Sequence, residues 1–135
     1  MGTRLITSIV VIFIVSLLLI GCNSSGTSNS NQANNYKDIS ADQLSSMMET
    51  NKNLLVVDVR EQAEYDQGHI SGALLLPTSE IESRVKELPK DKTIALVCAS
   101  GARSSQAAAY LISLGYQDVY NLSGGLSSWP NELVK

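Results

Sequence analysis

Short apolar runs alternate with segments of helical spacing from about residue 36 onward. The apolar, largely β-branched runs predict strands at residues 54–57, 73–76, 93–97 and 119–122. The segments between them predict helices at residues 40–49, 61–67, 79–88 and 103–114. Strands that alternate with helices in this way are typical of an α/β domain with a parallel sheet and helices on both faces.

Local signals mark the expected ends of these helices. Ser40 with Gln43, and Ser79 with Glu82, have the spacing of a capping box, in which each side chain satisfies a backbone N–H of the first turn. Gly115 predicts the end of the last helix.

The first residues have the pattern of an export signal. A short positive segment at residues 1–4 precedes an uncharged apolar run at residues 5–20, and Gly21 then stands directly before Cys22. This segment, residues 1–21, resembles a bacterial lipoprotein signal peptide, which implies cleavage before Cys22 and a lipid on its sulfur. The alternative is an uncleaved membrane anchor with an incidental cysteine. Both alternatives place the rest of the chain in the cell envelope, outside the cytoplasmic membrane.

The next segment, residues 22–35, predicts a flexible tether to the membrane. After Cys22 it is rich in Asn and Ser and has a single apolar residue, Ala33, so it has too little apolar surface to fold. About 100 residues then remain for one domain at residues 36–135. The net charge of −3 gives no basic surface for nucleic acid.

Candidate chemistry lies between the strand at residues 93–97 and the helix that follows it. Cys98 is placed where unpaired N–H groups at a helix start favour a thiolate or a bound anion, and Arg103 adds a permanent cation. The alternative for Cys98 is an inert cysteine in the core. The hydroxyls of Ser100 and Ser104 could either bind substrate oxygens or cap the helix.

Other polar and aromatic residues are interpreted mainly as structural. Asp58 ends a predicted strand, as Cys98 does, and ligands of parallel sheets bind beyond such ends. Asp58 and Arg60 could orient the loop or the substrate, or could form an ion pair that holds the strand end. His69 is assigned to the scaffold. A packing role is expected for the aromatic residues Tyr65, Tyr110, Tyr116 and Trp129.

Cysteine usage bears on the same loop. The chain has two cysteines, so lipidation of Cys22 would leave Cys98 as a lone thiol in an exported protein. A disulfide between Cys22 and Cys98 is the alternative, and lipidation would exclude it.

Several short motifs occur in the order expected of one known family. They are Val57-Asp58-Val59-Arg60, Glu64-Tyr65 with Gly68-His69-Ile70-Ser71-Gly72-Ala73, Cys98-Ala99-Ser100-Gly101-Ala102-Arg103-Ser104, Leu114-Gly115-Tyr116, and Asn121-Leu122-Ser123-Gly124-Gly125-Leu126 with Trp129. On these motifs the chain resembles the rhodanese domain, a sulfurtransferase module. The resemblance implies a single α/β domain with a mainly parallel, five-stranded sheet.

The resemblance also implies a site and a reaction. Cys98 would carry sulfane sulfur as a persulfide, while Arg103 would bind the oxyanion of the donor and stabilise the persulfide. Backbone N–H groups of a substrate-binding loop would surround this sulfur, and the loop residues are Ala99, Ser100, Gly101, Ala102 and Ser104. The donor would be a small sulfur-containing anion such as thiosulfate, and the acceptor a thiol, cyanide or a protein thiol. No metal or organic cofactor is implied.

Two other functions are compatible with such a loop. One is a sulfane-sulfur carrier that serves an envelope partner with little turnover of small molecules. The other is a cysteine phosphatase or arsenate reductase, but the loops of those enzymes have one residue more between Cys and Arg than Cys98 and Arg103 have here.

Overall fold

The structure is a computed structural model that describes residues 35–135. The predicted signal peptide at residues 1–21, the lipidation of Cys22 and almost all of the tether lie outside the described residues. Within residues 35–135, no helix combines the length and apolar character needed to cross a membrane.

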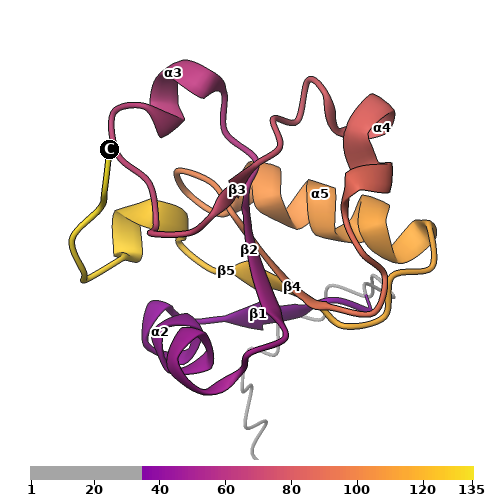
Figure 1. The fold of residues 1–135 in the computed structure, drawn as a ribbon, viewed down its shortest axis with the longest axis horizontal. Helices are drawn as coiled ribbons and strands as arrows, with labels where there is room; N and C mark the ends of the chain where they lie inside the picture. Colours follow the sequence, from indigo (N-terminus) through magenta and orange to yellow (C-terminus); the bar gives the residue numbers. More distant parts are fainter. Residues whose placement is uncertain (1–34) are drawn as a thin grey trace, which may run out of the picture. The chain divides into compact units, whose positions relative to one another are not determined.

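A five-stranded parallel sheet forms the centre of the domain (Figure 1). Its strands are β1 (Lys37–Ile39), β2 (Leu54–Asp58), β3 (Leu74–Leu75), β4 (Thr93–Val97) and β5 (Val119–Leu122), in the spatial order β1-β5-β4-β2-β3. Every neighbouring pair is parallel. The predicted α/β domain with a parallel sheet of five strands is confirmed.

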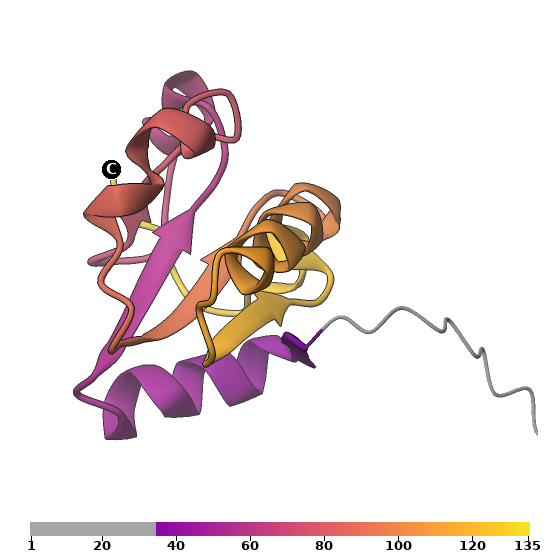
Figure 2. The ribbon, with the colours of Figure 1, turned by 90° about the vertical axis from the view of Figure 1, so that its right-hand side faces the viewer.

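Helices cover both faces of this sheet. They are α2 (Ala41–Thr50), α3 (Gln62–Tyr65), α4 (Ile81–Arg84) continued by the 3₁₀ turn η1 (Val85–Glu87), α5 (Ala102–Ser113) and the 3₁₀ turn η2 (Gly125–Ser128). Figure 2 shows α2 on one side of the sheet and α5 on the other. Alternate residues of the strands therefore enter two separate cores.

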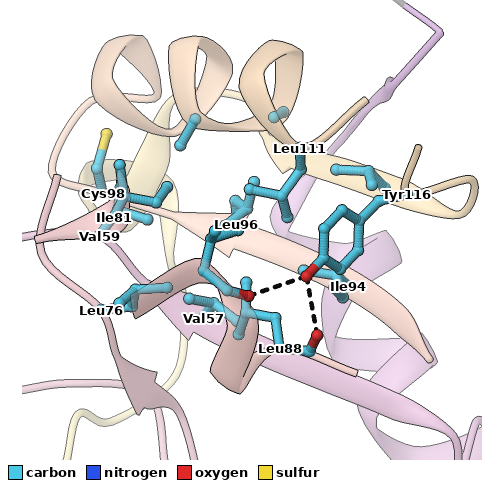
Figure 3. Packing of buried hydrophobic residues seen from close by; sticks show 14 residues of the cluster. Val57, Val59, Leu76, Ile81, Leu88, Ile94, Leu96, Cys98, Leu111 and Tyr116 are labelled. Atoms are coloured by element: carbon cyan, nitrogen blue, oxygen red, sulfur yellow. Dashed lines mark hydrogen bonds between the residues drawn. The ribbon is translucent and has the colours of Figure 1, made fainter. Parts of the chain in front are cut away.

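The central strand β4 is buried along its whole length because both of its faces are covered. Ile94 and Leu96 pack in the core beneath α4 and α5, whereas Ala95 and Val97 pack in the core beneath α2. Figure 3 shows the first core, in which the hydroxyl of Tyr116 lies within hydrogen-bond distance of the carbonyls of Val85 and Leu88.

Some local predictions were wrong in extent. The strand β1 has no apolar run and was not located from the sequence; it pairs on one side only, with β5. The helix expected at residues 79–88 begins at Ile81 and tightens into η1. Ser79 does not cap it, because its hydroxyl donates to the carboxylate of Glu61 instead. The capping box of Ser40 and Gln43 is present as predicted.

The order of the strands reverses its direction between β2 and β4. These strands are neighbours, but the chain leaves β2 toward β3 on one side and leaves β4 toward β5 on the other. Connections that diverge in this way leave room for a ligand beyond the carboxyl ends of the strands. Asp58 ends β2, and Cys98 directly follows β4.

Candidate active site

The loop after β4 folds around the sulfur of Cys98. Gly101, at the N-cap of α5, has a φ of 94°, a left-handed conformation that glycine adopts readily. Its N–H donates to the Cys98 Sγ at 3.1 Å, and the Ser104 hydroxyl lies 3.4 Å from the same sulfur. Cys98 is a free cysteine with an exposed fraction of 0%. In Figure 3 its sulfur lies at the edge of the core, beside the first turn of α5.

Opposing influences act on the pKa of the Cys98 thiol. Burial is the largest of them and raises the pKa, since it disfavours the charged form. Hydrogen bonds from Ser104, through its side chain and its backbone, and from the backbones of Ser100 and Gly101 favour the thiolate. Together these donors prevail, and the pKa lies below its usual value. The cysteine is therefore both packed as a core residue and prepared for ionisation.

Backbone hydrogen bonds from the turn η2 hold the beginning of this loop in place. The N–H of Leu126 donates to the Cys98 carbonyl at 2.8 Å, and the N–H of Ser127 donates to the Ala99 carbonyl at 3.0 Å. The backbones approach so closely that a Cβ on Gly125 would lie 2.5 Å from the Cys98 carbonyl oxygen. This close approach explains the need for glycine at position 125.

Arg103 faces a carboxylate from another element. Its two terminal nitrogens each donate to a different oxygen of Glu64, on α3, and both distances are 2.7 Å. The hydrogen bonds from Arg103 lower the pKa of Glu64 to about 2, and the pKa of Arg103 is raised in turn. The side chains remain about one third exposed. The guanidinium expected to bind a donor oxyanion is thus already occupied by a carboxylate.

Asp58 and Arg60 form a buried ion pair at the end of β2. The Arg60 guanidinium donates to both carboxylate oxygens of Asp58, with a shortest distance of 2.7 Å. It also donates to the carbonyls of Glu64 and Gly68, at the end of α3 and beyond it. The pair therefore ties α3 to the sheet, and this in turn positions the carboxylate that meets Arg103.

The remaining loop residues differ in their surroundings. Ser104 is fully buried against the sulfur, whereas Ser100 and Ala102 are exposed and Ala99 is half-buried. Only Ser104 among the two serines brings its hydroxyl to Cys98 in the hydrogen bonds described.

His69 and the aromatic residues lie in the scaffold. The ring of His69 stacks on Tyr65 at 3.7 Å between centroids, and its Nδ1 lies 3.1 Å from the Tyr65 carbonyl oxygen. Tyr65 and Trp129 pack against the core beneath α2, while Tyr110 and Tyr116 belong to the other core. Among residues 35–135, no three His, Cys, Asp or Glu side chains gather in a way that could hold a metal ion.

Two polar residues of the site had no role assigned from the sequence. Glu64 belongs to one of the motifs that carry the family resemblance, and the sequence predicts no contact between it and Arg103. Asn121 accepts a hydrogen bond from the Ser104 hydroxyl at 2.6 Å and donates to Asp38 at 2.7 Å. The available signal was a polar residue within the apolar run of residues 119–122, since buried polar groups need partners.

Comparisons with known proteins agree with this fold. A family model described as the rhodanese-like domain matches residues 40–132. A protein named sulfurtransferase from Allochromatium vinosum is 45% identical over 92 residues, which cover 68% of this chain and 86% of that protein. The thiosulfate sulfurtransferase GlpE of Shewanella oneidensis is 36% identical, over 70% of this chain and 92% of its own. The crystal structure of a rhodanese-like domain protein from Staphylococcus aureus matches with a TM-score of 0.68 and 33% identity, over 73% of this chain and 96% of that chain.

Proposed function

Because this chain belongs to the rhodanese-like domain family, we propose that it is a sulfurtransferase that carries sulfane sulfur as a persulfide on Cys98. The observation that carries the proposal is the loop around this sulfur, whose donors lower the pKa of the thiol despite its burial. Donors that favour a thiolate also favour a persulfide anion, because both place negative charge on sulfur within the loop.

The reaction has two displacement steps. The Cys98 thiolate attacks the outer sulfur of a donor such as thiosulfate, the sulfur–sulfur bond of the donor breaks, and its electron pair leaves with sulfite. A nucleophilic acceptor, cyanide or a thiol, then attacks the outer sulfur of the persulfide. The persulfide bond breaks, and its electron pair returns to Cys98 as the thiolate.

Arg103 is proposed to bind the oxyanion of the donor. A guanidinium binds such oxygens well through paired N–H groups. In this chain both terminal nitrogens donate to Glu64, so the donor must displace that carboxylate or bind beside it.

We further propose that the domain works at a membrane surface outside the cytoplasm, tethered through a lipid on Cys22. The apolar run that ends at Gly21 and Cys22 supports this location, as does the polar segment that follows. Intact-mass analysis of the native protein tests it, because a lipid on Cys22 and a sulfur on Cys98 add different masses. An uncleaved N-terminus without lipid would refute the lipid on Cys22 and favour the uncleaved membrane anchor instead.

Sulfite release from thiosulfate, with cyanide as acceptor, tests the activity. Cys98→Ser removes the sulfur nucleophile and is expected to abolish turnover. Ser105→Ala is the matched control, since the Ser105 hydroxyl lies on the same helix but donates only to the Ala102 carbonyl in the hydrogen bonds described. Turnover by Cys98→Ser at the rate of the unaltered protein would refute the assignment.

A sulfane-sulfur carrier for an envelope partner is the second candidate function. The burial of Cys98 favours it, because a sulfur with an exposed fraction of 0% is shielded from small acceptors in solution. Mass spectrometry separates the two functions. A carrier retains one added sulfur in the presence of cyanide, whereas a turnover enzyme loses it.

A further inference from the structure

The hydroxyl of Ser104 lies near three acceptors but has only one hydrogen to donate. It lies 2.6 Å from the Asn121 Oδ1, 3.2 Å from the Gly101 carbonyl oxygen and 3.4 Å from the Cys98 Sγ. A serine hydroxyl has one hydrogen and therefore donates fully to one acceptor at a time. Ser104 and Asn121 are both buried, with exposed fractions of 0% and 4%, so bulk water does not supply a replacement donor.

Asp38 fixes which end of the Asn121 amide faces Ser104. Asn121 and Asp38 are register partners on the adjacent strands β5 and β1, so their side chains lie on the same face. An ionised carboxylate can only accept, so it holds the amide nitrogen of Asn121, at 2.7 Å. The amide oxygen is thereby directed to Ser104, where it takes the hydroxyl hydrogen.

We propose that Asn121, held in this orientation by Asp38, competes with Cys98 for the single hydrogen of Ser104 and so limits how readily the thiolate forms. In the thiol form Ser104 donates to Asn121 and can accept the S–H hydrogen of Cys98. When the thiol ionises, the hydroxyl must turn to the sulfur, and the buried oxygen of Asn121 loses its donor. Asn121 and Asp38 are thus positioning residues that act on Cys98 through Ser104.

Other charges around the loop are already paired. Arg103 of α5 is held by Glu64 of α3, and Arg60 is held by Asp58 at the end of β2. The turn η2, which packs on the loop, has the sequence GLSS and no charged residue. Changes at Asp38 leave these ion pairs in place, so they can isolate the effect of the Ser104 hydrogen.

Asp38→Asn is the decisive variant. Asn in place of Asp38 can donate as well as accept, which frees the amide of Asn121 to turn its nitrogen to Ser104. The Ser104 hydrogen then becomes available to Cys98, and the pKa of the thiol is expected to fall by about one pH unit. Asp38 is exposed at the sheet edge, so the substitution leaves the cores intact.

Asp42→Asn is the matched control for charge. Asp42 lines the same surface hollow as Asp38, so Asp42→Asn removes a charge from the same place. Asp42 has no hydrogen bond to Asn121 among those described. The pKa is read from the ultraviolet absorbance of the thiolate against pH and, independently, from the rate of alkylation by iodoacetamide. Ser104→Ala is expected to raise the pKa, and in that background Asp38→Asn is expected to have no further effect.

Two results would overturn the proposal. One is a pKa in Asp38→Asn equal to that in Asp42→Asn, and the other is a fall that persists when Ser104 is replaced by Ala. The proposal rests on the proposed function only in taking Cys98 as the reacting sulfur. If the unaltered protein takes no sulfur from any donor, the proposed function fails, while these titrations still decide the role of Asn121.

Discussion

Replacing Glu64 by Gln tests whether the carboxylate that holds Arg103 restrains the use of an anionic donor. Gln keeps the size of the side chain but removes its charge. Arg103 then keeps at most one hydrogen bond to it and can turn toward a donor oxyanion. We expect the kcat/KM for thiosulfate to rise, mainly through a lower KM, because binding no longer requires a carboxylate to be displaced.

The magnitude follows from the pKa of Glu64. The pKa of Glu64 is lowered from 4.5 to about 2, and this shift corresponds to at most about 3 kcal/mol of interaction with Arg103 and its neighbours. Both side chains are about one third exposed, so solvent screening reduces the usable value to about 1 kcal/mol. That is about fivefold in kcat/KM. Because the pKa is lowered on folding, this contribution is complete above pH 4.5 and is lost only as the pH falls toward 2.

The assay compares two donors and one control variant. The release of sulfite measures the rate with thiosulfate. The release of the parent thiol measures the rate with a persulfide donor, which carries no oxyanion on its sulfur. Glu64→Gln is expected to improve the first and leave the second unchanged. Glu61→Gln is the control, since Glu61 is adjacent in space but bonds to Ser79 rather than to Arg103. Unchanged or lower kcat/KM for thiosulfate in Glu64→Gln would refute the reasoning.

Three further substitutions, two of them paired with a control variant, test the framework that holds the site. Gly125→Ala places a Cβ 2.5 Å from a backbone oxygen and is expected to cost about 3 kcal/mol in urea unfolding. Gly72→Ala, also at positive φ but with open space around it, should cost only about 1 kcal/mol; equal losses would contradict the steric argument. Arg60→Met leaves its buried carboxylate partner unpaired and should cost about 3 to 5 kcal/mol, and a loss below 1 kcal/mol would show that the pair is not needed. Tyr116→Phe removes a buried hydroxyl whose hydrogen is shared between two carbonyls, and should lower the stability by about 1 to 3 kcal/mol. Tyr120→Phe is its control, because the hydroxyl of this half-buried tyrosine takes part only in an exposed hydrogen bond, from Lys37, among those described. Similar Tm values for the two variants would argue against the prediction.

Much of the fold could be predicted because its signals are local. The strand at residues 119–122 was predicted at its observed bounds, and the helix at residues 103–114 is shifted by one residue from α5. In both, apolar periodicity and a glycine stop act within a few residues of each other. The strand β1 was missed because three residues with two exposed positions have no apolar period, and only pairing with β5 makes them a strand.

Part of the candidate site could likewise be predicted from local signals. Cys98, Arg103 and the small residues between them could be predicted because their chemistry lies in one continuous loop whose spacing is visible in the sequence. The end of β4 and the start of α5 place that loop at the carboxyl edge of the sheet, as the alternation of strand and helix implies.

The sequence by itself determined the α/β domain and the position of Cys98 in a loop of small residues between a strand and a helix. Only the tertiary structure decided which side chains act on that loop. Glu64 bonds to Arg103, which lies 39 positions away in the sequence, and Asn121 bonds to Ser104, which lies 17 positions away. Such partners depend on how helices dock on the sheet and on which strands become neighbours. Short-range periodicity carries no information on these long-range contacts, because they arise only when distant segments pack together.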